Sequence, residues 1–351
     1  MTSFPLSNFT IGLAVIGGLL LTVLIAWNAW TTRRNTPRQA RPPGAPPQAG
    51  ASDPVLERNE PVFTDTGPAS LPLPLPEKKA GLDALIDVIA PIALDVPVSG
   101  EAALAALPGT RRAGSKPFAI EGWNEAAVGW ELPHSGNRYV AFQAGVQMAN
   151  RTGALNEIEY SEFVMKAQAF ADAVNGSPEF PEMLHEVARA RELDQFASDH
   201  DAQLSFTLRA RDAAWSPGYL QQNAAQLGFV SGVIPGRMVL PAQAQGLPPV
   251  LGLTFDTQAA MAEDPALSAI REVTLSLDVP QVDRGERPFV RMRETALALA
   301  TAMDGDLTDD NGQLIPRDAL DGIGADLEQL YDTLDGRDLS AGSVLARRLF
   351  S

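Results

Sequence analysis

Cysteine is absent from this 351-residue chain, and histidine occurs only three times. The absence of cysteine excludes disulfide bonds, catalysis by a thiolate and zinc bound by cysteine. The net charge of -16 argues against nucleic acid as a partner, because phosphate binding depends on clustered Lys and Arg side chains. The remaining composition, 45% hydrophobic and 20% charged, is typical of globular domains, and the length predicts about two of them.

The motifs of common enzymes and metal sites are also missing. The sequence contains neither a GxSxG nucleophile turn nor a GxGxxG dinucleotide fingerprint. His134 lies in a predicted HSGN turn, His185 stands beside two glutamates on a predicted helix, and His200 lies in a predicted SDHDA linker. No two of them have the i, i+4 spacing of a helical metal site. The sequence therefore predicts surface histidines, no enzymatic activity, no metal and no cofactor.

Two loops resemble known phosphate or ion sites without meeting their requirements. The run GTRRAGSK has Ser115 before Lys116 and is followed by Pro117, so it departs from the phosphate loop of nucleotide-binding proteins. We expect an exposed basic loop at this position. The run DGDLTDDNGQLI has Asp309 and Ile315 where a calcium loop needs glycine and glutamate. We expect a polar turn between helices there.

One uncharged apolar run stands near the N-terminus. Phe9–Trp30 reads FTIGLAVIGGLLLTVLIAWNAW, which is long enough to cross a hydrocarbon core of about 30 Å as a helix. Basic residues follow this run and none precedes it, so the positive-inside rule places everything after Trp30 in the cytoplasm. The sequence predicts a membrane anchor over residues 1–34, with the following arginines near anionic headgroups. These arginines are Arg33, Arg34, Arg38 and Arg41.

Residues 35–78 are rich in proline and poor in periodic apolar residues. Such a composition cannot bury a core, so we expect a semi-extended linker. In polyproline geometry its residues would reach about 100 Å. A proline-rich peptide ligand is the alternative interpretation of the run LPLPLP within it.

Beyond the linker the same order of predicted elements occurs twice. We predict an α+β fold with two tandem units, residues 79–198 and 199–336, followed by a tail over 337–351. Each unit is expected to be an antiparallel sheet backed by helices on one face. The expected strands are 85–92, 118–123, 128–132 and 138–148 in the first unit, and 204–208, 229–234, 237–240, 250–255 and 272–279 in the second. The expected helices are 99–107 and one from residue 159 in the first unit, and 217–227 and 287–303 in the second.

The long helices of the two predicted units align without a gap. Residues 160–176 and 289–305 place apolar side chains at the same positions, which form one stripe along each helix. Gly176 and Gly305 are predicted to stop these helices, and Pro181 and Pro316 are predicted near the first turn of the next ones. The matched stripe favours a tandem duplication of one α+β unit.

The alternation of apolar and polar residues in the strands predicts a sheet with one open face. In EVTLSLDV, Val273 and Leu275 point toward the core while Thr274 and Ser276 point away. If helices cover only the apolar face, the polar face remains available to a partner.

Four segments of the second unit resemble the C-terminal domain of ZipA-type bacterial cell-division proteins. They are QLGFVSG (226–232), LSLDVP (275–280), the helix over 287–305 and LTDDNGQLIPRDAL (307–320). The anchor and the proline-rich linker are similar to that family in layout. The resemblance implies a protein that tethers cytoplasmic FtsZ filaments to the inner membrane at midcell during division and septum formation. It implies FtsZ and the membrane as partners, without nucleic acid or a small-molecule substrate.

The resemblance also implies a shallow groove on the open sheet face that accepts the C-terminal tail of FtsZ. In the first unit, Trp123 is placed like Ile234 of the second, with Trp130 on the next strand. It is a candidate anchor, and a half-buried core tryptophan is the alternative interpretation. Because only Ile234 is apolar among the matching positions of the second unit, a membrane-bound scaffold for another protein or peptide is the alternative function. The groove-lining positions are Gln203, Ser205, Ile234, Asp256 and Ser276.

Overall fold

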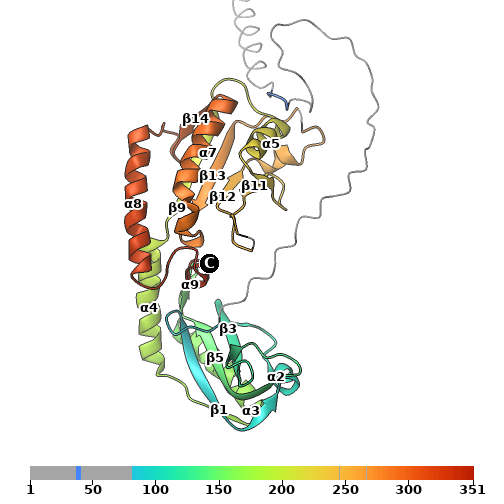
Figure 1. Ribbon diagram of the computed structural model, residues 1–351, viewed down its shortest axis with the longest axis vertical. Helices are drawn as coiled ribbons and strands as arrows, with labels where there is room; N and C mark the ends of the chain where they lie inside the picture. The colour runs from blue at the N-terminus through green and yellow to red at the C-terminus, as the bar shows by residue number, and fades with distance from the viewer. Residues whose placement is uncertain (1–36, 41–80, 245, 266) are drawn as a thin grey trace, which may run out of the picture. The chain divides into compact units, whose positions relative to one another are not determined.

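The computed structural model describes residues 37–40, 81–244, 246–265 and 267–351. The predicted span Phe9–Trp30 and most of the predicted linker lie outside these residues. Within the described ranges, no helix combines the length and the hydropathy that crossing a membrane requires. The described residues divide into two compact units (Figure 1). The first unit contains residues 81–203, 278–288 and 322–351, and the second contains 37–40, 204–277 and 289–321.

The first unit is built on an antiparallel sheet with the strand order β2-β3-β5-β1-β8, in which β4 also pairs with β3. Helix α3 covers one face of this sheet, where Phe118 contacts Phe163 and Phe142 contacts Phe170 through their rings. The elements are β1 (Asp87–Ser99), α2 (Gly100–Ala106), β2 (Arg112–Ala113), β3 (Lys116–Asn124), β4 (Gly129–Glu131), β5 (Arg138–Gln147), β6 (Ala149–Asn150), β7 (Gly153–Ala154), α3 (Glu157–Ala173), β8 (Gly176–Pro178), α4 (Met183–His200), η1 (Val279–Gln281), η2 (Arg284–Glu286) and α9 (Val344–Leu349).

The second unit has a sheet with the strand order β10-β11-β12-β13-β9-β14. Helix α7 covers one face of it (Figure 1). Phe289 of this helix contacts Phe206 of β9 at a ring distance of 6.5 Å. Its elements are β9 (Gln203–Ala210), α5 (Pro217–Gln226), β10 (Val230–Ser231), β11 (Arg237–Leu240), β12 (Leu251–Thr254), α6 (Thr257–Ala260), β13 (Glu272–Asp278), α7 (Pro288–Met303) and β14 (Gly305–Thr308). Helix α8 (Arg317–Asp335) contributes residues to both units. The predicted mixture of helices with antiparallel sheets is thus confirmed.

The two sheets share one strand order. The order β2-β3-β5-β1-β8 in the first unit corresponds to β11-β12-β13-β9-β14 in the second. In both units the last strand pairs with the first strand of the unit. The tandem duplication itself stays a prediction, and this shared order is consistent with it.

The predicted apolar stripe is buried along both long helices. Such a stripe holds each helix on its sheet through apolar contact, because its period matches the helical turn. The buried positions are Tyr160, Phe163, Ala167, Phe170 and Val174 on α3 and its C-terminal end, and Phe289, Met292, Ala296, Leu299 and Met303 on α7.

The predicted glycine stops are wrong by one residue. The left-handed position after each helix is taken by Asn175, with a φ of 53°, and by Asp304, with a φ of 56°. Asn and Asp tolerate this conformation better than other residues with a side chain. Gly176 and Gly305 instead begin β8 and β14. A Cβ at Gly176 would lie 2.7 Å from the side chain of Ile92, so close packing against the first strand requires glycine there.

Three ionisable residues also lie in surroundings other than those predicted. His200 is the last residue of α4, and its ring stacks on Phe196 at 4.3 Å, because the helix continues through the predicted SDHDA linker. Arg38 was expected near lipid headgroups, yet its guanidinium pairs with Asp304. Lys116 belongs to a strand and is fully buried, whereas an exposed loop was expected.

Candidate partner-binding surface

The face of the second sheet opposite α7 is lined by small and polar side chains. Gly252 of β12 pairs with Ser276 of β13 on one side and with Val239 of β11 on the other. Ser205 of β9 lies opposite Ser276 of β13. Two backbone hydrogen bonds at the ends of these strands set this register: Ala210 N donates to Arg271 O, and Val279 N donates to Ala202 O. We call this surface the second open face. It consists of Ser205, Thr207, Gly252, Thr254, Thr274 and Ser276, which are all partly exposed.

Threonine forms a row on this surface. Thr308 of β14 pairs with Thr207 of β9, and Thr274 of β13 pairs with Thr254 of β12. Thr308 is buried, and its hydroxyl donates to the carbonyl of Thr207 at 3.1 Å. Thr207, Thr254 and Thr274 are partly exposed, and threonine hydroxyls can donate or accept hydrogen bonds.

Gly252 lies in the middle of the second open face, with the Ser276 side chain close beside it. A Cβ at this position would lie 2.8 Å from the Oγ of Ser276. The Ser276 hydroxyl donates to the Gly252 carbonyl at 3.4 Å, so both residues lie low on the sheet. A bound peptide could approach the backbone closely here, as glycine in a strand permits.

Four of the five positions implied for the second unit lie along strands or strand ends of this sheet. Gln203 is the exposed first residue of β9, and Ser205 is held by a hydrogen bond from its Oγ to Asp310 Oδ1 at 2.6 Å. Asp256 follows β12 and caps α6 by accepting from the Gln258 N–H at 2.9 Å. Ser276 is at the centre of the face, as described above. Their binding role stays a prediction.

Ile234 lies apart from these four, in the turn between β10 and β11, and is 51% exposed. Val230 and Val233 are also exposed, and Val230 pairs with Val239 at the edge of the sheet. We call Val230, Val233 and Ile234 the apolar rim. Sequence reasoning missed both valines, although the segment FVSGVI contains apolar residues that do not fit the alternation of a strand.

Trp123 and Trp130 form a cross-strand pair in the first unit. Trp123 of β3 is opposite Trp130 of β4, and their rings meet edge to face at 5.4 Å. Trp130 is 41% exposed. Trp123 does not correspond to Ile234 in position, because β3 takes the place of β12 in the shared strand order while Ile234 precedes β11.

The corresponding open face of the first sheet is covered by the chain itself. Leu82 lies over Gly145 of β5, and a Cβ at Gly145 would lie 2.4 Å from its Cδ2. The Leu82 N–H donates to Glu121 Oε1 at 3.1 Å, and Gln143 Nε2 donates to Glu121 Oε2 at 2.9 Å. Glu121 is buried at this contact. The expectation of a free face therefore holds less well for the first sheet than for the second.

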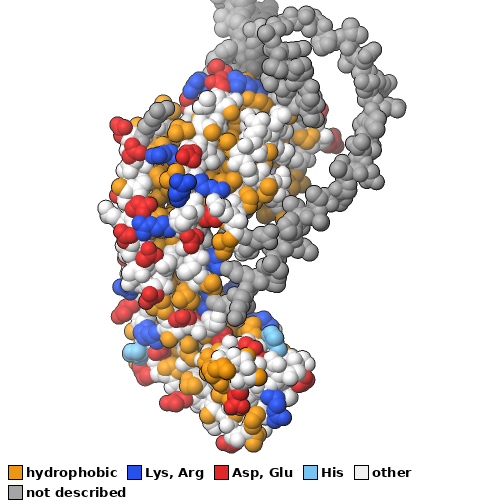
Figure 2. Space-filling model, viewed as in Figure 1, with side chains coloured by type: hydrophobic (Ala, Val, Ile, Leu, Met, Phe, Trp, Pro, Cys, Tyr) orange, Lys and Arg blue, Asp and Glu red, His pale blue; other side chains and the backbone are white. Residues whose placement is uncertain are grey.

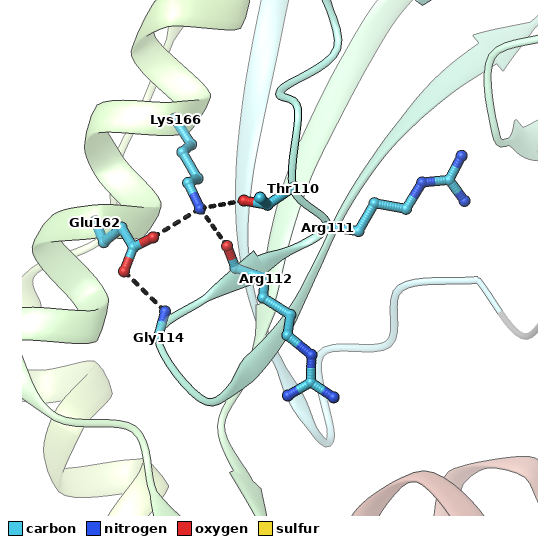
Figure 3. Close-up of a pocket in the computed structure, with 6 residues that line it drawn as sticks. All are labelled: Thr110, Arg111, Arg112, Gly114, Glu162 and Lys166. Carbon is cyan, nitrogen blue, oxygen red and sulfur yellow. Dashed lines mark hydrogen bonds and ion pairs between the residues drawn. The ribbon is translucent and has the colours of Figure 1, made fainter.

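A second surface feature of the first unit is a pocket beside the basic loop. Figure 3 shows Lys166 with its Nζ directed at Thr110, at the Arg112 carbonyl and at Glu162, while the side chains of Arg111 and Arg112 point away from it. The Lys166 ammonium lowers the pKa of Glu162 by a direct hydrogen bond. Lys166 and Glu162 are therefore already paired with other groups that line the pocket. Figure 2 shows acidic and basic side chains interspersed over α8.

Lys116 has a structural place below this loop. Its ammonium donates to Asn150 Oδ1 at 2.8 Å and to the Gly153 carbonyl at 2.5 Å, and burial lowers its pKa. The Lys116 ammonium therefore points into the protein and donates its hydrogen bonds there. Among the described residues, no cluster of His, Asp and Glu could hold a metal ion.

Comparison with known proteins places one family on the second unit. No curated protein matches the chain. Residues 258–325 match the family model described as the ZipA C-terminal FtsZ-binding domain. The matched segment contains β13, α7 and β14, which form much of the second sheet and the helix on its back. Over this segment the chain is similar to the ZipA C-terminal FtsZ-binding domain.

Proposed function

We propose that the chain tethers FtsZ filaments to the cytoplasmic side of the inner membrane during cell division. The observation that carries the proposal is the family match over residues 258–325, because it contains β13, a strand of the second open face, and α7 on the opposite face of the sheet. The second unit would bind the C-terminal tail of FtsZ on this face. No step of this function requires a catalytic residue or a cofactor.

The contact surface supports a peptide ligand of moderate affinity. The apolar rim offers exposed side chains that can anchor the tail, and a few such anchors usually supply most of the binding free energy. The serine and threonine hydroxyls can pair with peptide backbone groups. Because these polar groups also bind water well, they add less net free energy than an apolar floor would. The surface therefore favours specificity over strength.

Binding is assigned to the second unit in this proposal. Leu82 and Glu121 already occupy the open face of the first sheet, so a peptide would have to displace them. The Trp123–Trp130 pair remains a candidate secondary contact, since Trp130 is partly exposed. We also propose that the two units, predicted at 79–198 and 199–336, arose by duplication and then diverged in their open faces.

The membrane part of the proposal rests on the sequence. Phe9–Trp30 would span the inner membrane with the arginines on the cytoplasmic side. Anchored copies confined to one surface have a high effective concentration along a filament, so weak contacts are sufficient to hold it.

The alternative is a membrane-bound scaffold for a different protein or peptide. It is favoured by the polar character of Gln203, Ser205, Asp256 and Ser276, which leaves Ile234 as the single apolar side chain among the five implied positions.

A fluorescent fusion distinguishes these functions in cells. The tether predicts a band at midcell that is lost from the membrane when residues 9–30 are removed. It also predicts loss of the band with Ile234→Asp and its retention with Ile158→Asp, which changes an equally apolar exposed side chain on α3. A uniform membrane distribution of the unmodified fusion would support the scaffold.

A further inference from the structure

The second unit binds a short segment of the chain from far away in the sequence. Pro37, Arg38, Gln39 and Ala40 lie within the predicted linker, yet they are grouped with the second unit. Pro37 is buried and Arg38 is partly buried. This placement gives the segment a definite binding site.

The backbone of Arg38 adds a short parallel strand contact to the second unit. Its N–H donates to the Ala214 carbonyl at 2.7 Å, and its carbonyl accepts from the Ser216 N–H at 2.9 Å. These bonds form a parallel bridge with Trp215, which is bridged on its other side to Ile270. Arg38 thus extends a small hydrogen-bonded network in the same way that peptides extend the edge of a sheet.

The guanidinium of Arg38 binds at the C-terminal end of α7. Its Nη2 donates to Asp304 Oδ2 at 2.8 Å, and its Nη1 donates to the Met303 carbonyl at 3.2 Å. Carbonyl groups at this end of a helix carry a partial negative charge, so a cation is favoured there. The carboxylate and the helix end therefore act on the same side chain.

Two aromatic side chains bind the C-terminal end of α7. Trp215 is fully buried and its Nε1 donates to the Met303 carbonyl at 2.8 Å. The Tyr219 hydroxyl donates to the Ala302 carbonyl at 3.1 Å. Both aromatic side chains hold the end of α7 in place. A site that is already formed loses little entropy when a ligand binds.

We propose that the end of α7 and the start of α5 form an intramolecular binding site for residues 37–40, with Arg38 as the anchor. Asp304, the Met303 carbonyl and the backbone groups of Ala214 and Ser216 recognise it. The contact holds the chain just after the predicted span on the surface of the second unit. Release of Arg38 would be required before residues 41–80 could lengthen the tether of this unit.

The effect on the reach of the tether rests on the proposed membrane span, whereas the contact between Arg38 and the second unit does not. Seven residues separate Trp30 from Arg38, and the eight steps between their Cα atoms extend about 28 Å at most. The clamped second unit would therefore stay close to the bilayer. The full linker would reach about 100 Å. The clamp would thus set the distance at which a filament is held.

Trypsin cleavage of the full-length protein in nanodiscs tests the clamp without FtsZ. Trypsin cuts after arginine only where the chain can open, so cleavage of the Arg38–Gln39 bond should be about tenfold slower than in a synthetic peptide of residues 31–46. Asp304→Asn should increase the rate several-fold, because the amide keeps the left-handed backbone conformation but loses the charge. Asp306→Asn is the matched control, since Asp306 pairs with Arg211 at 2.6 Å.

Two outcomes overturn the proposal. One is equal cleavage of the bond in the protein and in the peptide. The other is a rate that is the same in the unmodified protein and in Asp304→Asn. Hydrogen exchange at the Ser216 amide provides a second readout, because this amide donates to Arg38 and should exchange faster in Asp304→Asn than in Asp306→Asn. Neither readout depends on FtsZ, so a failure of FtsZ binding is scored separately.

Discussion

Leu82 lies over Gly145 on the open face of the first sheet, so close that a methyl group on the glycine would stand 2.4 Å from the leucine side chain. The second sheet carries small and polar residues on its open face instead. The two units thus share a strand order while their open faces differ in what covers them. This difference is the physical reason for assigning partner binding to the second unit.

Gly145→Ala is predicted to destabilise the first unit by about 1–3 kcal/mol, because the added methyl group must displace Leu82. In a Leu82→Ala background the same substitution should cost much less, since the clash is removed. Chemical denaturation of all four proteins measures this coupling. Gly109→Ala is the control, because a Cβ there meets no atom within 4 Å. A cost that is unchanged by Leu82→Ala would contradict the described contact.

Phe170→Asp and Leu299→Asp are each predicted to lower the free energy of unfolding by about 3–5 kcal/mol. Both side chains belong to the buried stripes, so the substitution removes apolar contact and buries an unpaired charge. Leu297→Asp on the same helix as Leu299 should cost far less, because Leu297 is 36% exposed. Equal losses at positions 297 and 299 would show that the stripe is misplaced.

Asp87 should make stability depend on pH at the acidic end. Burial raises the pKa of Asp87 above its ordinary value of 3.8, and the Arg348 guanidinium, whose Nη2 is 2.5 Å from Asp87 Oδ1, opposes the shift only in part. The folded state therefore binds the proton more tightly than the unfolded state. The stabilisation is present below pH 3.8 and is lost as the pH rises through the folded pKa.

The measurement is the free energy of unfolding between pH 3.5 and pH 6, about the range of a raised carboxyl pKa, for the unmodified protein and for Asp87→Asn. The stability of the unmodified protein relative to Asp87→Asn should fall as the pH increases. A relative stability that rises over this range would reverse the assigned direction of the pKa shift.

A reporter fused after Ser351 tests the predicted orientation. A reporter that is active only in the cytoplasm should work, and one that is active only in the periplasm should be silent, because the arginines follow the apolar run. Moving the arginines ahead of Phe9 should weaken this preference. An active periplasmic fusion would be incompatible with a tether for a cytoplasmic filament.

The sequence predicted correctly the features that depend on residues close together in the chain. The apolar period of α3 and α7 predicted the buried stripes, and the alternation in β13 predicted which residues face the open side. Arg38 could not be placed this way, because its partner Asp304 is 266 positions away. Lys116 was misplaced because the acceptors that permit its burial come from the later hairpin of β6 and β7.

The ion pairs that join distant segments of the first unit could not be predicted from the sequence either. Arg151 binds Asp201 at 2.6 Å and Asp278 at 2.8 Å, and Arg348 binds Asp87, so late segments of the chain belong to the first unit. Of the candidate site, the sequence predicted the polar strand positions on the sheet. It missed the valines of the apolar rim, because their exposure depends on where the sheet ends.

Trp123→Ala is predicted to reduce affinity for the FtsZ tail less than Ile234→Asp does. The covered face of the first sheet leaves the Trp123–Trp130 pair as a peripheral contact at most. Titration of the two variants side by side measures the difference. A larger loss with Trp123→Ala would move the main binding surface to the first unit.

The most direct test of the tether is titration of the full-length protein in nanodiscs with a labelled peptide of the FtsZ C-terminal tail. The account predicts saturable binding with a dissociation constant of about 10 μM to 1 mM, weakened about tenfold by Ile234→Asp and unchanged by Ile158→Asp. Absence of saturable binding at millimolar peptide, or binding that Ile234→Asp leaves intact, would contradict it.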